Sequence, residues 1–290
     1  MNKVNTIIIG AGRSGTTSVF AWMEQHPDIQ FSITKEVHYF SLPDLYKRGD
    51  GYLHSLFERT EKSVIATADT YLLMDHEAPA RIKAYNPAMR IIVMLRDPVD
   101  RAYSNYQYSV QFGHERAEIA FTDTIALEPE RLLSSDIAEK NNLCHCYGSL
   151  YAKHLQVWSD YFPKQQVFIG TLPELKNNPE ALYTRLSAFL NIPYQPFAEQ
   201  NKAFNAGTGV KSKKLQQFLL NRNHPVRRIL TFFIRPFRNL IIKSGIIDKV
   251  YSLNTKQVKL PKLTQEERNR VSPYFENDLK QLQDEWQITL

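Results

Sequence analysis

Short runs of apolar, often β-branched residues alternate along the first 190 positions with stretches in which apolar residues recur every three or four positions. The first pattern is typical of buried strands, and the second of helices that cover a sheet. Extended segments are predicted at Thr6–Ile9, Ile29–Ile33, Ser63–Ala66, Arg90–Leu95 and Gln166–Gly170. Helices are predicted at Thr16–Gln25, Pro79–Tyr85, Val99–Val110, Ser149–Tyr161 and Pro179–Leu190. This alternation predicts an α/β fold with parallel strands joined by crossover helices.

The pattern changes near residue 200. Residues 198–212 form a loop rich in Gly, Asn and Lys, and beyond it the sequence predicts helices and no strand. One of these helices begins with a capping box, in which Thr264 is followed three residues later by Glu267. We therefore expect an α/β domain over residues 1–200 and a helical extension over 201–290 that packs on the same domain.

A strongly basic segment lies within that extension. Residues 211–249 contain ten basic residues and one acidic residue, a net charge of +9, whereas the rest of the chain carries −3. Apolar residues recur there at helical spacing, with arginines on the opposite side and Pro236 as a kink. Three interpretations fit: a solvated helix face, a groove for an anionic glycan, or contact of residues 222–245 with anionic lipid.

Composition narrows the class of protein. With 290 residues and 43% hydrophobic content the chain can bury a large core, which excludes a disordered protein. The two cysteines, Cys144 and Cys146, form no zinc or disulfide pattern. Because no signal peptide and no long apolar run is present, we expect a cytoplasmic protein, with the inner face of the membrane as a second location. The charge of +6 suits anionic partners, but no nucleic-acid signature accompanies it.

A glycine-rich turn joins the first strand to the first helix. The segment Gly10–Thr17 (GAGRSGTT) would let backbone N–H groups approach an anion, and the helix start adds further donors. A Walker A loop would carry lysine where Thr16 stands, and the cation here is Arg13 instead. The G-x-G-x-x-G spacing of a dinucleotide site is also present, without the acidic residue expected about 20 positions later. An ordinary strand-to-helix turn is the third interpretation.

Three motifs in order resemble one family. They are GAGRSGTT at 10–17, KEVHYF at 35–40 and LRDPVDRAYSNY at 95–106. Together they are similar to sulfotransferases that use 3′-phosphoadenosine 5′-phosphosulfate (PAPS), and most of all to the branch that sulfates carbohydrates, including heparan-type and bacterial enzymes. The stretch 147–163 extends the resemblance to about residue 190. The resemblance implies a three-layer sandwich related to the P-loop kinases.

The resemblance also implies how PAPS is held. The 5′-phosphosulfate would lie on Gly12, Arg13, Ser14, Gly15, Thr16 and Thr17. The 3′-phosphate would be bound by Arg96 and Ser104, and a late loop with Lys211 would close over it. Independently, Arg96 follows a buried strand, at the end where open α/β sheets bind ligands. The alternatives are an ion pair of Arg96 with Asp97 or Asp100, and an ordinary surface position for Ser104.

Candidate proton-transfer residues lie in the second motif. Transfer of a sulfonate group to an alcohol needs a base for the hydroxyl proton, and the resemblance assigns that role to Glu36, with Arg13 as the cation on the transferred group. His38 shares the face of Glu36 in an extended segment, so it could orient the acceptor or hold Glu36. The ordinary alternatives are a surface pair of Glu36 with Lys35 and a structural histidine. No metal ion is expected.

The chain departs from the heparan-type pattern in two places, which involve three residues. Those enzymes carry an acidic residue where this chain has Ser41, and a Glu-Lys pair where it has Ala66 and Thr67. Lys35, Lys211 or Arg101 would have to replace the missing lysine.

The sequence as a whole predicts a PAPS-dependent sulfotransferase acting on a hydroxyl of a carbohydrate or glycolipid. Adenosine 3′,5′-bisphosphate would be the second product. Two other classes remain: a kinase-like phosphotransferase, and a silent module that binds glycan or membrane. The oligomeric state is not predicted.

Overall fold

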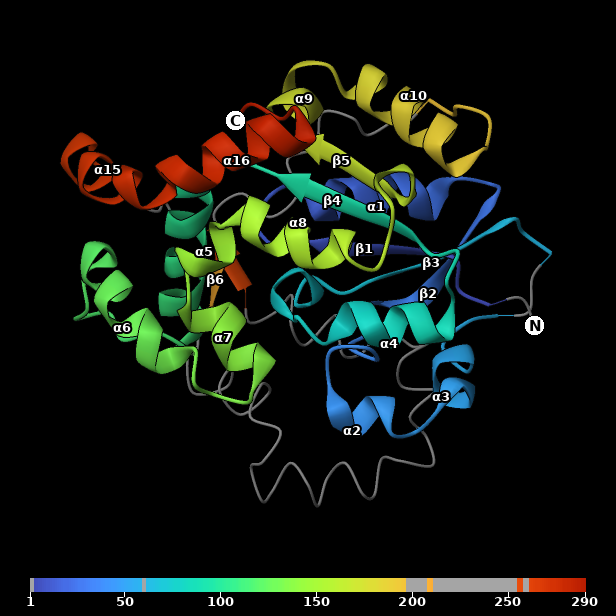
Figure 1. The fold of residues 1–290 in the computed structure, drawn as a ribbon, viewed down its shortest axis with the longest axis horizontal. Helices are drawn as coiled ribbons and strands as arrows, with labels where there is room; N and C mark the ends of the chain where they lie inside the picture. Colours follow the sequence, from blue (N-terminus) through green and yellow to red (C-terminus); the bar gives the residue numbers. More distant parts are fainter. Residues whose placement is uncertain (1–2, 59–60, 197–207, 211–254, 258–260) are drawn as a thin grey trace.

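The computed structural model describes residues 3–58, 61–196, 208–210, 255–257 and 261–290 (Figure 1). Its centre is a five-stranded sheet in which every neighbouring pair of strands is parallel. The strands, in the order β2-β3-β1-β4-β5, are β1 (Thr6–Gly10), β2 (Ile29–Glu36), β3 (Val64–Ala68), β4 (Arg90–Leu95) and β5 (Val167–Thr171). The predicted α/β class with a parallel sheet is therefore confirmed.

Helices cover both faces of this sheet and complete the three layers. One face packs against α4 (Ala78–Tyr85), α8 (Tyr151–Ser159) and α16 (Glu276–Trp286). The other face packs against α1 (Thr16–Gln25), α9 (Leu172–Asn177) and α10 (Pro179–Leu190).

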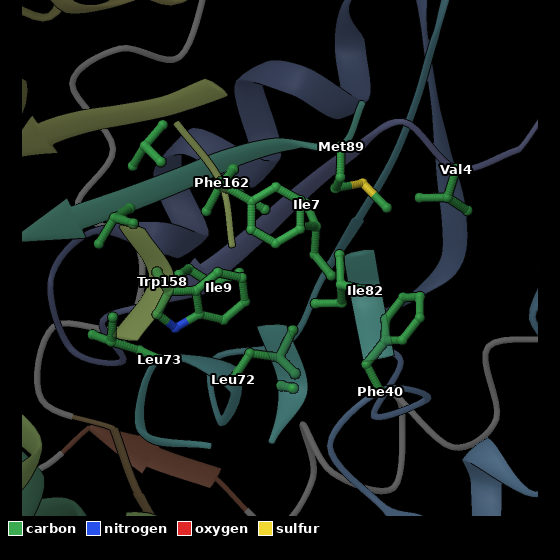
Figure 2. Close-up of a cluster of buried hydrophobic side chains, with 14 of the residues drawn as sticks. Val4, Ile7, Ile9, Phe40, Leu72, Leu73, Ile82, Met89, Trp158 and Phe162 are labelled. Carbon is green, nitrogen blue, oxygen red and sulfur yellow. The ribbon is translucent and has the colours of Figure 1, made fainter. Parts of the chain in front are cut away.

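The apolar run in β1 explains why the sheet is buried on both sides. Successive side chains of a strand point to opposite faces, so Ile7 and Ile9 enter one core and Ile8 enters the other. All three side chains are inaccessible to solvent. Figure 2 shows Ile7 and Ile9 in the first core, together with Trp158 and other large side chains.

Three helices lie beyond the carboxyl ends of the strands (Figure 1). They are α5 (Pro98–Phe112), α6 (Thr124–Arg131) and α7 (Ile137–Leu143). The remaining described helices are α2 (Pro43–Tyr46), α3 (Asp50–His54) and α15 (Gln265–Val271). Short 3-10 turns are found at Leu72–Met74, Phe121–Asp123, Tyr147–Ser149, Lys164–Gln166 and Ser272–Phe275. The apolar pattern did not predict α6 or α7.

The region after residue 200 corrects one prediction. A two-stranded antiparallel sheet pairs β6 (Thr208–Val210) with β7 (Thr255–Gln257), so the expectation of no strand in this region is wrong. Three residues are too few to show the two-residue alternation of a strand, and the pairing joins positions far apart in the chain. The capping box at Thr264 and Glu267 is confirmed. Lys211 and the basic segment 211–249 lie outside the described residues.

The C-terminal helix is fixed to the sheet domain by a charged cap. The Asp278 carboxylate of α16 accepts the backbone N–H groups of Ala152 (3.1 Å) and Lys153 (3.0 Å) in the first turn of α8. A carboxylate is favoured there because the helix start has unpaired N–H groups and the positive end of the dipole. Leu282, one turn further along α16, is buried in the first core.

Candidate functional site

The strand order brings four chain segments to one edge of the sheet. Because β1 lies between β3 and β4, the turn after β1 is flanked by the residues that follow those two strands. The end of β2 lies beside β3, where Glu36 pairs with Ala68. Residues 10–17, which we call the phosphate loop, thus share an edge with Glu36, Asp69 and Arg96.

The phosphate loop has the strand–turn–helix geometry that its sequence predicts. Helix α1 begins at Thr16, and Gly15 precedes it with a left-handed φ of 92°. A Cβ atom on Gly15 would lie 2.8 Å from the Leu175 side chain, so both the φ angle and the close packing require glycine. The first N–H groups of α1 have no partner within the helix, which makes this end of α1 suited to an anion.

Arg13 extends from the loop to α5. Its Nε donates to the Ser104 hydroxyl at 3.2 Å, and its guanidinium lies 5.1 Å from the centre of the Tyr108 ring. Burial lowers the pKa of Arg13, and the charges of Arg96 and Arg101 lower it further. Positive charge is therefore concentrated around the loop, and an anion bound there would relieve the repulsion.

Arg101 and Arg96 contact carbonyl groups of the phosphate loop. The buried Arg101 donates from Nε to the Gly12 carbonyl (3.0 Å) and from Nη1 to the His145 carbonyl (3.1 Å). Arg96 lies 3.4 Å from the Arg13 carbonyl and 3.6 Å from the Asp100 carboxylate. The ion pair considered as the ordinary interpretation of Arg96 is thus present, alongside its contact with the loop.

Glu36 ends β2 and is held from two sides. One carboxylate oxygen lies 3.1 Å from Lys35 Nζ, and the other accepts the Thr70 backbone N–H at 2.8 Å. Lys35 also donates to the Thr17 hydroxyl of α1 at 3.2 Å. The expected pair with Lys35 exists, and it links Glu36 directly to the phosphate loop. The Glu36 side chain remains 31% exposed, so a ligand can reach it.

His38 contacts a carboxylate that the sequence analysis did not select. Its Nδ1 lies 3.0 Å from Oδ1 of Asp69, which follows β3 directly. Ser41 donates to the other Asp69 oxygen at 2.5 Å. The possible ligand atoms of Glu36, His38 and Asp69 lie within 4.8 Å of one another, so this is a group that could hold a metal ion.

One pocket of about 400 Å³ joins these features. The pocket is lined by cationic and hydroxyl side chains, and by Glu36 and His38. The lining residues are Gly12, Arg13, Thr16, Thr17, Lys35, Glu36, His38, Thr70, Tyr71, Arg101, Asn105, Tyr108, Phe112, Asn141 and Asn142.

Two further positions from the sequence analysis, Ser14 and Thr67, do not line this pocket. Ser14 is fully buried, so the loop would use its backbone there rather than its hydroxyl. Thr67, where the resemblance expects lysine, is buried within hydrogen-bond distance (3.1 Å) of the Ser32 hydroxyl. Of the three proposed replacements, Lys35 and Arg101 line the pocket. Lys211 lies outside the described residues.

Next to Asn105 in the pocket lining is a set of ionisable side chains that we call the support network: Glu115, Arg131 and His145. Arg131 donates two hydrogen bonds to the Glu115 carboxylate, at 2.7 and 3.0 Å. His145 Nε2 lies 3.3 Å from the same carboxylate, and its Nδ1 lies 3.0 Å from Asn105 Nδ2 in the pocket wall. These hydrogen bonds and ion pairs lower the pKa of Glu115 to about 2 although burial opposes them.

Sequence reasoning missed Asp69, Asn105 and the support network. Asp69 left a signal, because it is an acidic residue directly after a buried strand, at the edge where ligands bind, and Asn105 lies within the third motif. The members of the support network come from α5, α6 and α7 and the residues beside them, and their spacing in the sequence carries no motif.

A strand–glycine turn–helix with cations and a carboxylate around one pocket is an arrangement suited to an anionic ligand at the edge of an α/β sheet. Residues 3–218 match the model of the sulfotransferase domain family. The chain therefore belongs to this family of enzymes.

Known proteins resemble the chain in sequence and in fold. Mouse heparan sulfate glucosamine 3-O-sulfotransferase 3B1 is 30% identical over 187 residues, which cover 64% of this chain and 45% of that protein. Mouse heparan sulfate glucosamine 3-O-sulfotransferase 5 is 27% identical over 207 residues, covering 70% and 57%. The chain thus spans about half the length of these relatives. A sulfotransferase structure from Alicyclobacillus acidocaldarius has a TM-score of 0.68 at 20% identity, covering 100% of this chain and 98% of that one.

Among the described residues, no helix is long and apolar enough to cross a membrane.

Proposed function

We propose that this protein is a sulfotransferase that moves the sulfonate group of PAPS to a hydroxyl of a carbohydrate or glycolipid, with Glu36 as the general base. The observation that carries the proposal is the pocket in which the phosphate loop and Glu36 are linked by Lys35, whose Nζ lies 3.2 Å from the Thr17 hydroxyl and 3.1 Å from the Glu36 carboxylate. Family membership and the names of the heparan sulfate relatives support it.

The donor side of the pocket fits a molecule with several phosphate or sulfate groups. Arg13, Lys35 and Arg101 line the pocket, together with the hydroxyls of Thr16 and Thr17 and the first N–H groups of α1. We expect these groups to bind the phosphosulfate, and Arg96 and Ser104 to bind the 3′-phosphate. When bound, PAPS supplies the sulfonate group and leaves as adenosine 3′,5′-bisphosphate. Arg13 and the loop amides would stabilise the charge on the transferring group.

The acceptor side holds the proposed base. Lys35 and Thr70 fix the direction of the Glu36 carboxylate, so that it can accept the proton of a hydroxyl held beside the phosphate loop. An amine is the second candidate acceptor. The basic segment 211–249 remains our proposed place for an anionic glycan or an anionic lipid, and Lys211 for closure over the 3′-phosphate.

A kinase-like reaction has less support in the structure. Asp97, the acidic residue that follows β4, accepts the Asp100 backbone N–H at 2.8 Å and pairs with Arg268 at 3.1 Å. Asp97 therefore caps α5 and pairs with a residue of α15. The group of Glu36, His38 and Asp69 is the arrangement that a metal-dependent alternative would use. A catalytically silent binding module is the other alternative, and it predicts glycan binding without turnover of PAPS.

Calorimetric titration with adenosine 3′,5′-bisphosphate tests the donor site first. We expect dissociation constants in the micromolar range and much weaker binding of ATP. Binding of ATP without binding of the bisphosphate would contradict the proposal. Transfer from radiolabelled PAPS should then be measured with a heparan-type oligosaccharide and with a glycolipid in vesicles, each with and without EDTA. Transfer that EDTA leaves unchanged supports sulfonate transfer without a metal.

The base assignment has its own test. Glu36→Gln keeps the size of the side chain and its contact with Thr70, and removes the ability to take a proton. We expect transfer to fall by about 10²–10⁴-fold while bisphosphate binding stays within a few-fold. Glu24→Gln, on the far end of α1, is the matched control and should leave both unchanged. An undiminished rate for Glu36→Gln would remove the base assignment and leave the donor site standing.

A further inference from the structure

Asp69 is a buried carboxylate whose hydrogen-bond partners are well defined. It is 2% exposed and directly follows β3. Its Oδ2 accepts the Ser41 hydroxyl at 2.5 Å, and its Oδ1 accepts the Tyr71 backbone N–H at 3.1 Å. Oδ1 is also 3.0 Å from His38 Nδ1. A buried carboxylate is costly unless donors surround it, and here donors come from three directions.

His38 is held in one orientation beside Glu36. Its backbone has a left-handed φ of 55°, an uncommon conformation for a residue other than glycine. Its ring packs against Tyr71 at 4.6 Å between ring centres, and its side chain lines the same pocket as Glu36. The backbone conformation, the ring contact with Tyr71 and the hydrogen bond to Asp69 together hold the imidazole in one orientation.

The geometry points to a role for Asp69 that rests on the function proposed above. We propose that Asp69, supported by Ser41, is a positioning residue that keeps the His38 proton on Nδ1, so that Nε2 can accept a hydrogen bond from a second hydroxyl of the acceptor while the reacting hydroxyl donates to Glu36. An ionised carboxylate can only accept hydrogen bonds, so Nδ1 must donate to it. A neutral imidazole has one N–H, so with Nδ1 as the donor Nε2 is the acceptor nitrogen of a ring that lines the pocket.

This assignment explains the departure at Ser41. The resemblance predicts an acidic residue at that position, and here Ser41 instead donates to an acidic residue that directly follows the neighbouring strand β3. Asp69 is 31 residues from His38 in sequence, and the parallel pairing of β2 with β3 brings them together.

A purely structural role is the alternative, and Asp75 provides its control. Asp75 is also buried, and its Oδ1 accepts the backbone N–H two residues ahead, from Glu77 at 3.0 Å, as Asp69 does from Tyr71. Asp75 does not line the pocket. If Asp69 only stabilises a turn, then Asp69→Asn and Asp75→Asn should have the same consequences.

The first test needs no variant with altered Asp69. Nitrogen NMR of the histidine rings, with the His38 signal assigned through His38→Gln, reports which ring nitrogen carries the proton. For the neutral ring we expect the proton on Nδ1. A proton found on Nε2 in the unaltered protein would overturn the proposal, whatever reaction the enzyme catalyses.

The second test uses Asp69→Asn. The Asn amide can donate to His38, so we expect the proton to move to Nε2 and the transfer rate to fall by about 10²–10⁴-fold, as expected for a wrongly protonated imidazole. Bisphosphate affinity should stay within about threefold. Asp75→Asn should change neither the His38 signal nor the rate. An unmoved His38 proton, or a rate no lower than that of Asp75→Asn, contradicts the positioning role.

These outcomes separate the two proposals. If the unaltered protein does not bind adenosine 3′,5′-bisphosphate, the proposed function fails, while the NMR measurement still decides the Asp69–His38 pairing. If it binds the bisphosphate and transfers sulfonate, but Asp69→Asn does so equally well, only the positioning role fails.

Discussion

Two groups of ionisable side chains contact helix α5, one through Arg13 at Ser104 and the other through His145 at Asn105. The pocket group consists of Arg13, Lys35 and Glu36, and the support network consists of Glu115, Arg131 and His145. In the pocket group the pair Lys35–Glu36 is 24% and 31% exposed, and the side chains make hydrogen bonds to hydroxyl or backbone groups. In the support network the pair Arg131–Glu115 is 13% and 2% exposed and is joined by two parallel hydrogen bonds.

The two groups differ in exposure: the charges of the pocket group are accessible to a ligand, whereas those of the pair Arg131–Glu115 are largely buried against each other. A bidentate, buried pair satisfies most of its hydrogen-bonding capacity within the protein, so breaking it leaves an unpaired charge out of water. The accessible charges of the pocket group can exchange their contacts for contacts with an anion. We therefore expect changes in the support network to lower stability, and changes in the pocket group to lower binding and turnover.

The largest expected effect is on stability. Arg131→Met removes one partner of the buried pair and leaves the Glu115 carboxylate uncompensated, so we expect a loss of about 3–5 kcal/mol in the free energy of unfolding. Urea unfolding measures it. The matched control is Arg116→Met at an exposed neighbour, which should change stability by less than about 0.5 kcal/mol. Equal effects of the two variants would remove the contrast between the groups.

Arg13→Ala tests the pocket group. It removes the cation of the phosphate loop and its contact with Ser104, so we expect kcat/KM for PAPS to fall by about 10²–10³-fold with little change in the unfolding temperature. Arg13→Lys should recover part of the activity, because the charge remains without the planar fork. Arg48→Ala, at an exposed arginine, is the control. A loss of stability without a loss of binding would place Arg13 with the support network.

The dependence of stability on pH distinguishes two buried carboxyl groups, Glu115 and Glu128. The folded pKa of Glu115 is lowered to about 2, so its contribution is present above pH 4.5 and is lost as pH falls toward 2. Burial raises the folded pKa of Glu128 to about 7, although the backbone N–H groups of Cys146 and Tyr147 oppose it. The contribution of Glu128 to the free energy of unfolding is fully present below pH 4.5. It is lost as pH rises through 7, which lowers that free energy by about 3 kcal/mol.

Unfolding temperatures measured from pH 4 to pH 8 check the Glu128 part of this prediction. Glu128→Gln cannot ionise, so the decline between pH 4.5 and 7 should become shallower. Glu130→Gln, two positions along at an exposed site, should keep the decline of the unaltered protein. An unchanged slope in Glu128→Gln would mean that another group titrates there.

The smallest expected effect is at Ser104. Ser104→Ala removes the acceptor of the Arg13 hydrogen bond and a proposed contact to the 3′-phosphate, so bisphosphate affinity should fall about three- to tenfold. Titration calorimetry measures it, with Ser55→Ala at an exposed position as control. No loss of affinity would assign Ser104 to the helix surface, as the simpler interpretation of the sequence had it.

Local patterns predicted the elements that bury one clear face or begin at a clear signal. The helices at Thr16–Gln25 and Pro179–Leu190 and the strand at Arg90–Leu95 have the predicted bounds. Strand β2 runs three residues beyond the prediction, to Glu36, because pairing with β3 continues after an irregularity in the register, where the sequence has become polar. Helix α6 contains Pro129, which the sequence pattern treats as a breaker.

By itself the sequence determined the class of fold and the glycine turn that carries Arg13, because both depend on neighbours within a few positions, whereas Glu36 was selected through the resemblance to a family. Only the tertiary structure decided that Lys35 links Glu36 to Thr17, that Asp69 faces His38, and that Arg101 holds the Gly12 carbonyl. These contacts join residues 18 to 89 positions apart. Strand order and helix packing set such distances, and they leave no fixed spacing in the chain.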